Sequence, residues 1–322
     1  MIYSRIAGTG RYLPERVLTN AELEKTVDTT DEWIRSRTGI ERRHIAADDQ
    51  ATSDLAEAAA RHAMSAAGVD SQDIDLIIVG TTTPDLVFPN VATLVQERLG
   101  IHGCPAFSLE TACSGFVYAL DIADKFVRLG EARNALVIGA ETLSRITDWT
   151  DRNTCVLFGD GAGAVILQPA TEAGVISTHL HADGIYKDLL TANGGVSRRQ
   201  QLLVDQKVKI MMKGNEVFKV AVTTLGNVVE ETLERNKLDR HAIDWLVPHQ
   251  ANMRIIQATA RRLDMSMEKV VVTVQDHGNT SAASIPLALD TAVRDGRIKR
   301  GDLMLLETFG GGFTWGSALI RY

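Results

Sequence analysis

The stretch Ile74-Asp75-Leu76-Ile77-Ile78-Val79 is a short and almost uninterrupted aliphatic run. Runs of this kind are typical of strands that are buried on both faces of a sheet. A helix is predicted before it, with an N-cap at Ser53 and Asp54 and its end at Gly68, because apolar residues recur between them at helical spacing. Helices that alternate with buried strands predict an α/β layered fold.

The same alternation continues along the chain. A long helix is predicted over residues 218–233, where five apolar side chains recur at helical spacing. Further buried strands are predicted at residues 135–138, 243–247, 270–274 and 303–306.

The opening stretch also belongs to an internal repeat. Two pairs of segments are separated by the same 169 positions: Ile74-Asp75-Leu76 with Ile243-Asp244-Trp245, and Ala119-Leu120-Asp121 with Ala288-Leu289-Asp290. A third pair, at a shorter offset, relates Phe158-Gly159 and Gly163 to Phe309-Gly310 and Gly316. The common order predicts two copies of one α/β unit, residues 1–170 and 171–322, with a functional site where they meet.

Composition narrows the class of protein. The chain has 322 residues, of which 45% are hydrophobic and 23% charged, and these fractions exclude disorder, collagen and coiled coil. Its net charge of −7 makes nucleic acid an unexpected partner. No apolar run approaches the length of a membrane span or a signal peptide. Three cysteines without a C-x-x-C pair favour a reducing compartment over a disulfide framework or structural zinc, so we expect a cytoplasmic protein.

The segment Thr111-Ala112-Cys113-Ser114-Gly115-Phe116 carries the strongest chemical signal. It joins an apolar segment to a helical pattern, which places Cys113 at a predicted helix N-terminus. The positive end of a helix dipole can lower a thiol pKa from about 8.5 to roughly 3.5–7.5 and so produce a thiolate nucleophile. The alternative is that Cys113 is a small buried hydrophobe, as we expect for Cys104 and Cys155.

Two polar residues in the second copy are candidate partners of this thiol. His249 follows the strand predicted at 243–247, at the end where α/β sheets bind ligands. Asn279 follows Gly278, which permits a tight turn, and precedes a helix that the 169-residue offset pairs with the helix after Cys113. The repeat therefore predicts that Cys113 and Asn279 lie close together. The alternatives are helix capping for Asn279 and, for the neighbouring His277, a solvated loop position.

Two glycine clusters resemble functional motifs. Residues 159–164 match G-x-G-x-x-A, but a predicted strand follows where a nucleotide-binding helix would begin. Residues 310–312 suit either an oxyanion hole, with a backbone N–H near a reacting atom, or a tight turn. The spacing between Cys113 and His249 also fits papain-like proteases, but the local motif around the cysteine is absent.

Several motifs taken together resemble the β-ketoacyl-acyl carrier protein synthase III family, condensing enzymes that initiate bacterial type II fatty acid synthesis. The resemblance spans the chain and is carried by Asp31–Ile34, Arg37–Ile40, Ala112–Phe116, Pro248–Asn252, Gly278–Ala282 and Phe309–Gly316. It implies the thiolase-type fold, a five-layered α-β-α-β-α arrangement of two similar halves.

The resemblance also implies a role for each catalytic residue. Cys113 would accept the acyl group, and His249 with Asn279 would serve decarboxylative condensation. The N–H groups of Cys113 and Gly311 would form the oxyanion hole. Phe309 would limit access to the thiol, and Phe88 would reach into the acyl pocket of the other subunit in a homodimer.

Two binding surfaces are implied in the same way. Coenzyme A would be held around its adenine by Trp33 and Arg152, and along the entrance by Arg37, Gly214, Asn215 and Arg254. The acidic carrier protein would dock on Lys219, Gln250, Ala251, Asn252, Met253, Arg254, Arg261 and Arg262. A solvated helix face is the alternative for the basic members of this set.

The implied reaction condenses an acyl-coenzyme A primer, with acetyl-coenzyme A expected, and malonyl-acyl carrier protein. It gives 3-oxoacyl-acyl carrier protein, and such a multifunctional acyltransferase needs no metal or cofactor, since coenzyme A enters as part of the substrate. Two alternatives share the fold: a polyketide or quinolone-type condensing enzyme, and a non-catalytic interaction subunit.

Overall fold

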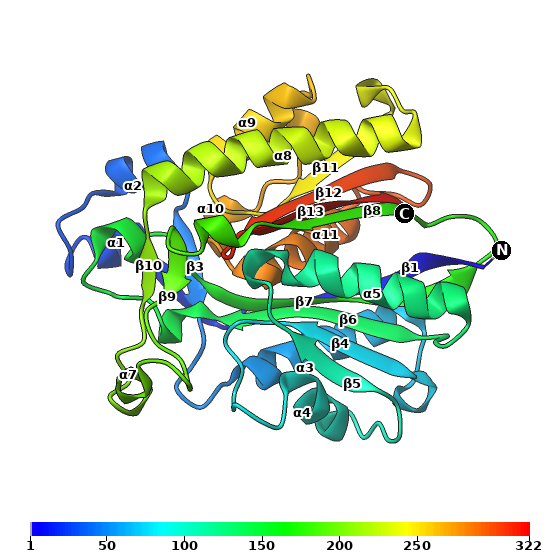
Figure 1. Cartoon of the computed structure of the whole chain (residues 1–322), viewed down its shortest axis with the longest axis horizontal. Helices are drawn as coiled ribbons and strands as arrows, with labels where there is room; N and C mark the ends of the chain where they lie inside the picture. The colour runs from blue at the N-terminus through cyan, green and yellow to red at the C-terminus, as the bar shows by residue number, and fades with distance from the viewer. Residues whose placement is uncertain (1) are drawn as a thin grey trace.

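Two sheets lie face to face with two helices between them and further helices on both outer faces (Figure 1). The structure is a computed structural model that describes residues 2–322. The first sheet has the order β1-β7-β6-β4-β5, and the second has the order β8-β13-β12-β11. In the first sheet β7 pairs antiparallel with β1 and β6, and β4 pairs parallel with β6. In the second sheet β13 pairs antiparallel with β8 and β12, and β11 pairs parallel with β12. The five layers confirm the predicted α/β thiolase-type architecture.

All strands of the first sheet precede residue 171, and all strands of the second sheet follow it. The first sheet contains β1 (Tyr3–Tyr12), β7 (Asp160–Ala170), β6 (Ala135–Thr142), β4 (Leu76–Gly80) and β5 (Ala106–Leu109). The second sheet contains β8 (Val175–Ala182), β13 (Thr314–Arg321), β12 (Leu303–Gly310) and β11 (Trp245–Pro248).

The helices complete the layers because their apolar faces cover the sheets. Helices α5 (Gly115–Leu129) and α11 (Ser284–Arg294) lie between the sheets, α3 (Thr52–Ala67) and α4 (Val91–Arg98) cover the first sheet, and α8 (Gly214–Asn236) and α9 (Met253–Arg262) cover the second. Shorter elements surround this frame: β2 (Arg16–Thr19), α1 (Asn20–Leu23), α2 (Asp31–Thr38), β3 (Arg42–Ile45), α6 (Arg152–Cys155), β9 (Leu190–Ala192), α7 (Gln200–Val204), β10 (Ile210–Met212) and α10 (Val274–His277).

The 169-residue repeat is reproduced element by element. Helices α5 and α11 begin 169 residues apart, as do β4 and β11, and α3 and α8 end 169 residues apart. The third sequence similarity holds only in part. Gly163 and Gly316 occupy equivalent places in antiparallel pairs, but Phe158-Gly159 precedes β7 whereas Phe309-Gly310 ends β12.

Two local predictions were wrong. Residues 270–274 form no strand, only an isolated parallel bridge between Val270 and Leu246. The side-chain oxygen of Gln250 accepts hydrogen bonds from the N–H groups of Thr273 (2.8 Å) and Val274 (3.1 Å), which a further strand would otherwise use. The N-cap predicted at Ser53 and Asp54 is instead Ala51: α3 begins at Thr52, and Asp54, in the first turn, accepts from the N–H of Ala51.

No helix among the described residues is both long enough and apolar enough to cross a membrane.

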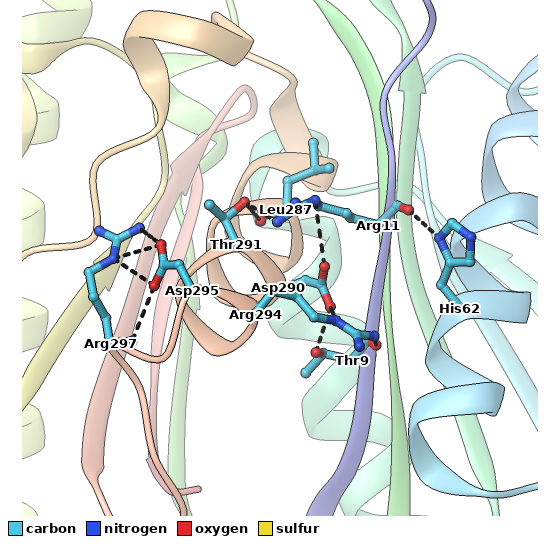
Figure 2. Close-up of polar contacts among 9 residues, drawn as sticks. All are labelled: Thr9, Arg11, His62, Leu287, Asp290, Thr291, Arg294, Asp295 and Arg297. Atoms are coloured by element: carbon cyan, nitrogen blue, oxygen red, sulfur yellow. Dashed lines mark hydrogen bonds and ion pairs between the residues drawn. The ribbon is translucent and has the colours of Figure 1, made fainter.

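The repeated aspartates join the two halves of the frame. Asp290 of α11 is 2% exposed and accepts a 2.7 Å hydrogen bond from the hydroxyl of Thr9 in β1 (Figure 2). Arg294 also contacts this carboxylate at 3.2 Å. The residues 169 positions away from this pair make the reciprocal contact, since Thr178 of β8 donates to Asp121 of α5. Each central helix is thereby tied to the edge strand of the opposite half.

Thr9→Val should destabilise the protein because it leaves a buried carboxylate with one donor fewer at nearly constant volume. We expect the free energy of unfolding, measured by chemical denaturation, to fall by about 1–3 kcal/mol. Thr223→Val removes an exposed hydroxyl from α8 and should change it by less than about 0.5 kcal/mol. Equal losses in the two variants would show that the Thr9–Asp290 contact is energetically unimportant.

Candidate active site

Cys113 is positioned by both halves of the molecule. It lies in a 3-10 turn, η2 (Ala112–Ser114), between β5 and α5. Its carbonyl oxygen accepts a 2.9 Å hydrogen bond from the Thr308 hydroxyl of β12. The hydroxyl of Ser114 donates to the carbonyl oxygen of Thr314 at 3.0 Å. The thiol therefore sits where the first half meets the second, as the repeat predicts.

Two backbone N–H groups beside the thiol are available to a ligand. Within residues 2–322 the N–H of Gly311 has no hydrogen-bond acceptor and the N–H of Cys113 contacts only its own sulfur, and both residues line one cavity. A Cβ at Gly310 would lie 2.7 Å from the Cys113 nitrogen, so only glycine permits this approach of backbones. Residues 311–313 form the turn between β12 and β13, which is the alternative role considered for the glycine cluster.

His249 follows β11 and is 5% exposed. Its Nδ1 atom lies 2.6 Å from the Ser284 hydroxyl oxygen at the start of α11. Burial lowers the pKa of His249 to about 3, because a charged imidazolium would lose its hydration here. His249 is consequently neutral at physiological pH.

The side chain of Asn279 is held by its own loop. Its main chain pairs with residues 157–159. The N–H of Asn279 donates to the carbonyl oxygen of Leu157 (2.9 Å), and the N–H of Gly159 donates to the carbonyl oxygen of Asn279 (3.0 Å). The N–H of Ser281 donates to the side-chain oxygen Oδ1 at 2.9 Å, which leaves the amide nitrogen as the outward group. Gly278 has a φ of +67°, and a Cβ there would approach the Leu157 oxygen to 2.9 Å.

Cys113 borders two cavities. The histidine cavity, about 220 Å³, is lined by Cys113, His249, Asn279 and Phe309 together with residues of α8 and α9. The leucine cavity, about 430 Å³, is lined by Cys113, Gly311 and apolar side chains that include Leu143, Ile146, Leu190 and Ile210. A group bound to the sulfur thus has these apolar side chains on one side, with Glu110 and Lys187 also in the lining, and the side chains of His249 and Asn279 on the other.

The thiol pKa differs from the sequence-based prediction. Burial raises the pKa of Cys113 to about 12, and the nearby carboxyl of Glu141 acts in the same direction. The thiol's contacts with the Ser281 side chain and with its own backbone N–H act in the opposite direction but are outweighed. The thiol is therefore protonated at neutral pH, and the predicted lowering of its pKa by the helix N-terminus is wrong.

Several residues of the site carried no recognised motif. Glu141, in β6, is fully buried and its carboxyl accepts from the Thr83 hydroxyl at 2.6 Å and the Ser281 hydroxyl at 3.0 Å. The sequence signal for Ser281 is the 169-residue offset, which pairs it with Ala112. In the structure the two residues share an unusual positive φ, +49° for Ser281 and +47° for Ala112. His277 is not solvated as expected: it is 9% exposed, and burial lowers its pKa to about 3.

Four of the six residues expected to hold coenzyme A line the histidine cavity: Arg37, Gly214, Asn215 and Arg254. The guanidinium groups of Arg37 and Arg152 lie 4.9 and 4.7 Å from the centre of the Trp33 ring. An aromatic base that inserted between Trp33 and one of these arginines would have to displace that arginine from the ring.

The residues expected to dock the carrier protein divide into two groups. Lys219, Arg254, Arg261 and Arg262 are exposed, although Arg262 is 3.6 Å from the Glu230 carboxylate. Ala251, Asn252 and Met253 are only partly exposed, and Asn252 caps α9 by accepting from the Ile255 N–H. Gln250 is 1% exposed, so its expected contact with a docked protein is wrong.

The two expected gate residues differ in exposure. Phe309 is 6% exposed and packs against Phe313 with their ring centres 4.5 Å apart. Phe88 is 83% exposed and lies in the loop between β4 and α4.

The duplicated five-layer fold, with a cysteine at a helix start and a neutral histidine and an asparagine beside it, defines a thiolase-fold condensing enzyme. Residues 107–184 and 233–322 match the models "3-Oxoacyl-[acyl-carrier-protein (ACP)] synthase III" and its C-terminal part. A β-ketoacyl-[acyl-carrier-protein] synthase III of Thioalkalivibrio sulfidiphilus is 65% identical over 322 residues, all of both chains. The chain therefore belongs to the 3-oxoacyl-[acyl-carrier-protein] synthase III family and is a condensing acyltransferase of fatty acid biosynthesis.

Solved structures agree with this assignment. The Aquifex aeolicus 3-oxoacyl-[acyl-carrier-protein] synthase III has a TM-score of 0.93 and 48% identity, covering 99% of this chain and 100% of its own. The priming β-ketosynthase of the R1128 polyketide pathway also has a TM-score of 0.93, at 36% identity, covering 99% and 96%. Fold similarity alone thus does not separate the two kinds of condensing enzyme, whereas the higher identity favours the first.

The raised thiol pKa predicts how alkylation of Cys113 depends on pH. Because the thiolate is the nucleophile, the rate with iodoacetamide should rise about tenfold per pH unit from pH 6.5 to 9.5, without a plateau. Peptide mapping by mass spectrometry separates Cys113 from Cys104 and Cys155. A plateau below pH 8 would show that the start of α5 outweighs burial.

Proposed function

We propose that the enzyme transfers an acyl group from coenzyme A to Cys113 and then condenses it with malonyl-acyl carrier protein. The location of Cys113 between the histidine and leucine cavities carries this proposal. The products are 3-oxoacyl-acyl carrier protein, carbon dioxide and free coenzyme A. No metal or redox cofactor is needed for these steps.

In the first step the Cys113 sulfur attacks the thioester carbonyl carbon. The negative charge that develops on the carbonyl oxygen is stabilised by the N–H groups of Cys113 and Gly311. Collapse of the tetrahedral intermediate releases coenzyme A as its thiol, which takes up the proton lost by Cys113. The acyl chain then occupies the leucine cavity, against its apolar side chains.

In the second step the malonyl group enters the histidine cavity. Loss of carbon dioxide leaves an enolate, whose carbon attacks the acyl-Cys113 carbonyl and expels the Cys113 thiolate. The thiolate then takes up one proton from solvent, which regenerates the thiol. His249 is neutral and Asn279 presents its amide nitrogen, so each can donate an N–H hydrogen bond to the enolate oxygen. Donors that are fixed before the reaction in a buried site act more strongly than donors in water.

Acetyl-coenzyme A is the proposed primer. Arg37, Arg152, Arg254 and the Trp33 ring offer charge for phosphates and a stacking surface for the adenine at the histidine cavity. Gly214 and Asn215 begin α8 at the same cavity.

The proposal includes a homodimer and a cytoplasmic location. Leu86, Val87 and Phe88 form an exposed apolar loop, 53%, 70% and 83% accessible, which a second subunit could cover with Phe88 reaching its acyl pocket. The three free cysteines suit a reducing compartment. We propose the boundary between the duplicated halves near residue 170, between β7 and β8.

Single-residue variants should separate the two half-reactions. His249→Ala and Asn279→Ala should still form acyl-enzyme with acetyl-coenzyme A, because the oxyanion donors are backbone groups. Each should lower condensation by about 10²–10³-fold, the typical cost of losing one preorganised donor. Single-turnover acylation is followed by intact mass, and condensation by release of carbon dioxide.

Variants of Cys113 and Cys104 provide the controls for this experiment. Cys113→Ala should lose acylation entirely, whereas Cys104→Ala, which alters a partly exposed cysteine outside both cavities, should retain both half-reactions. An acyl group mapped to Cys104 or Cys155 would refute the assignment of the nucleophile. Condensation at the parental rate by His249→Ala would refute the assignment of the histidine.

Charge reversal should test the docking surface. The double variant Arg261→Glu/Arg262→Glu should raise KM for malonyl-acyl carrier protein and weaken its dependence on salt, because such steering is screened within about 8 Å at physiological ionic strength. Transfer from acetyl-coenzyme A should be unchanged. Lys299→Glu, an exposed cation before β12, is the matched control and should alter neither half-reaction. Equal damage to both half-reactions would indicate a structural role for the two arginines.

A further inference from the structure

His249 and Ser284 form a buried pair with a role that the mechanism above leaves undetermined. The two residues are 5% and 1% exposed, and Nδ1 of the imidazole lies 2.6 Å from Oγ of the serine. His249 also lines the histidine cavity. Since Nδ1 is occupied by Ser284, the other ring nitrogen, Nε2, is the one available to a substrate.

The direction of the hydrogen bond decides which ring nitrogen carries the hydrogen of neutral His249. Ser284 Oγ already accepts a hydrogen bond from the N–H of Gln250 at 3.3 Å. Within residues 2–322 the hydroxyl hydrogen of Ser284 has no acceptor in reach other than Nδ1 of His249. If Nδ1 were the donor instead, this buried hydroxyl hydrogen would have no partner, which native structures avoid.

Gln250 keeps this arrangement rigid. Its side-chain nitrogen donates to the carbonyl oxygens of Pro248 and Val271, at 2.8 and 3.0 Å. Its side-chain oxygen accepts from two further backbone N–H groups. Gln250 is therefore held in place by four hydrogen bonds of its side chain, so its backbone N–H stays directed at Oγ of Ser284 and Oγ remains the acceptor.

The duplicated fold does not itself require this pair. At the 169-residue offset His249 corresponds to Gly80 and Ser284 to Gly115. These glycines also touch, because a Cβ on Gly80 would lie 2.5 Å from the Gly115 carbonyl carbon. Both halves bring the two positions together, but only the second half places an imidazole and a hydroxyl there.

We propose that Ser284 is a positioning residue that fixes His249 as the tautomer with hydrogen on Nε2. In that form Nε2 donates a hydrogen bond and has no lone pair with which to remove the Cys113 proton. His249 then acts in condensation as a donor to the enolate oxygen and takes no part as a base in acylation. This inference rests on the proposed function of His249 and adds which atom acts and what orients it.

The test measures the tautomer and the two half-reactions in the full-length enzyme. In protein labelled with [¹⁵N]histidine, His249 should show a protonated Nε2 and an unprotonated Nδ1, and the His249→Gln variant identifies its signals among the eight histidines. Ser284→Ala should give a mixture of tautomers and lower condensation about 10–100-fold, the same range as for removal of a partner that orients a metal-bound histidine. Its acylation rate should stay at the parental value.

Two conservative changes serve as controls. Ser284→Thr keeps the hydroxyl and should restore the Nε2–H signal and most of the condensation rate, whereas Ser284→Cys, a weaker donor, should give intermediate values. Hydrogen found on Nδ1 in the unmodified enzyme would overturn the inference even if every Ser284 variant failed to fold. Equal loss of acylation and condensation in Ser284→Ala would also overturn it, by showing a general structural role.

Failure of the inference can be told apart from failure of the proposed function. If His249→Ala condenses normally, the role proposed for His249 is wrong. If His249→Ala loses condensation but Ser284→Ala changes neither the tautomer nor the rate, only the inference about Ser284 is wrong. If His249→Ala cannot acylate, Nε2 acts as a base, and the tautomer assigned here is wrong.

Discussion

The close approach of backbones at the starts of the two central helices is the constraint on which the site depends. A Cβ on Gly139 of β6 would overlap the carbonyl oxygen of Ala282, just before α11. A Cβ on Gly310 of β12 would similarly crowd the nitrogen of Cys113, just before α5. Each helix therefore begins against a strand of the opposite half, and only glycine at these strand positions allows it. The nucleophile and the donors around it are consequences of this contact.

The same close packing sets the charge states of the site. Burial keeps His249 and His277 neutral, holds the Cys113 thiol protonated, and raises the pKa of Glu307, the neighbour of His249 across the sheet, to about 8. A dry environment strengthens the hydrogen bonds that neutral donors make to a developing oxyanion. It also opposes formation of the thiolate that starts the reaction. The site thus favours the stabilisation of charge on the substrate over the storage of charge on the enzyme.

Local patterns predicted most of the frame and much of the site. Buried strands and the 169-residue repeat depend on residue types at fixed spacing, so the layers, the two halves and the meeting of Cys113 with Asn279 could be derived from them. The errors concern tertiary context. Nothing near residues 270–274 shows that Gln250 takes over their N–H groups, and nothing near His277 shows that it is buried. The prediction of a lowered pKa for Cys113 was wrong for the same reason, because the local sequence shows that the residue begins a helix but does not show that the thiol is desolvated.

The reciprocal threonine–aspartate contacts bear on how such a molecule can arise. Thr9 meets Asp290 and Thr178 meets Asp121, so each half supplies one hydroxyl and one carboxylate to the other. Two identical chains related by a two-fold axis would satisfy both contacts at once. The frame is therefore one that a symmetric pair of single-copy ancestors could have formed before their genes were fused. Fusion would have allowed each copy to diverge. The first copy then has Cys113 where the second has Ala282, and the second has His249 where the first has Gly80, which gives an asymmetric catalyst on a symmetric scaffold.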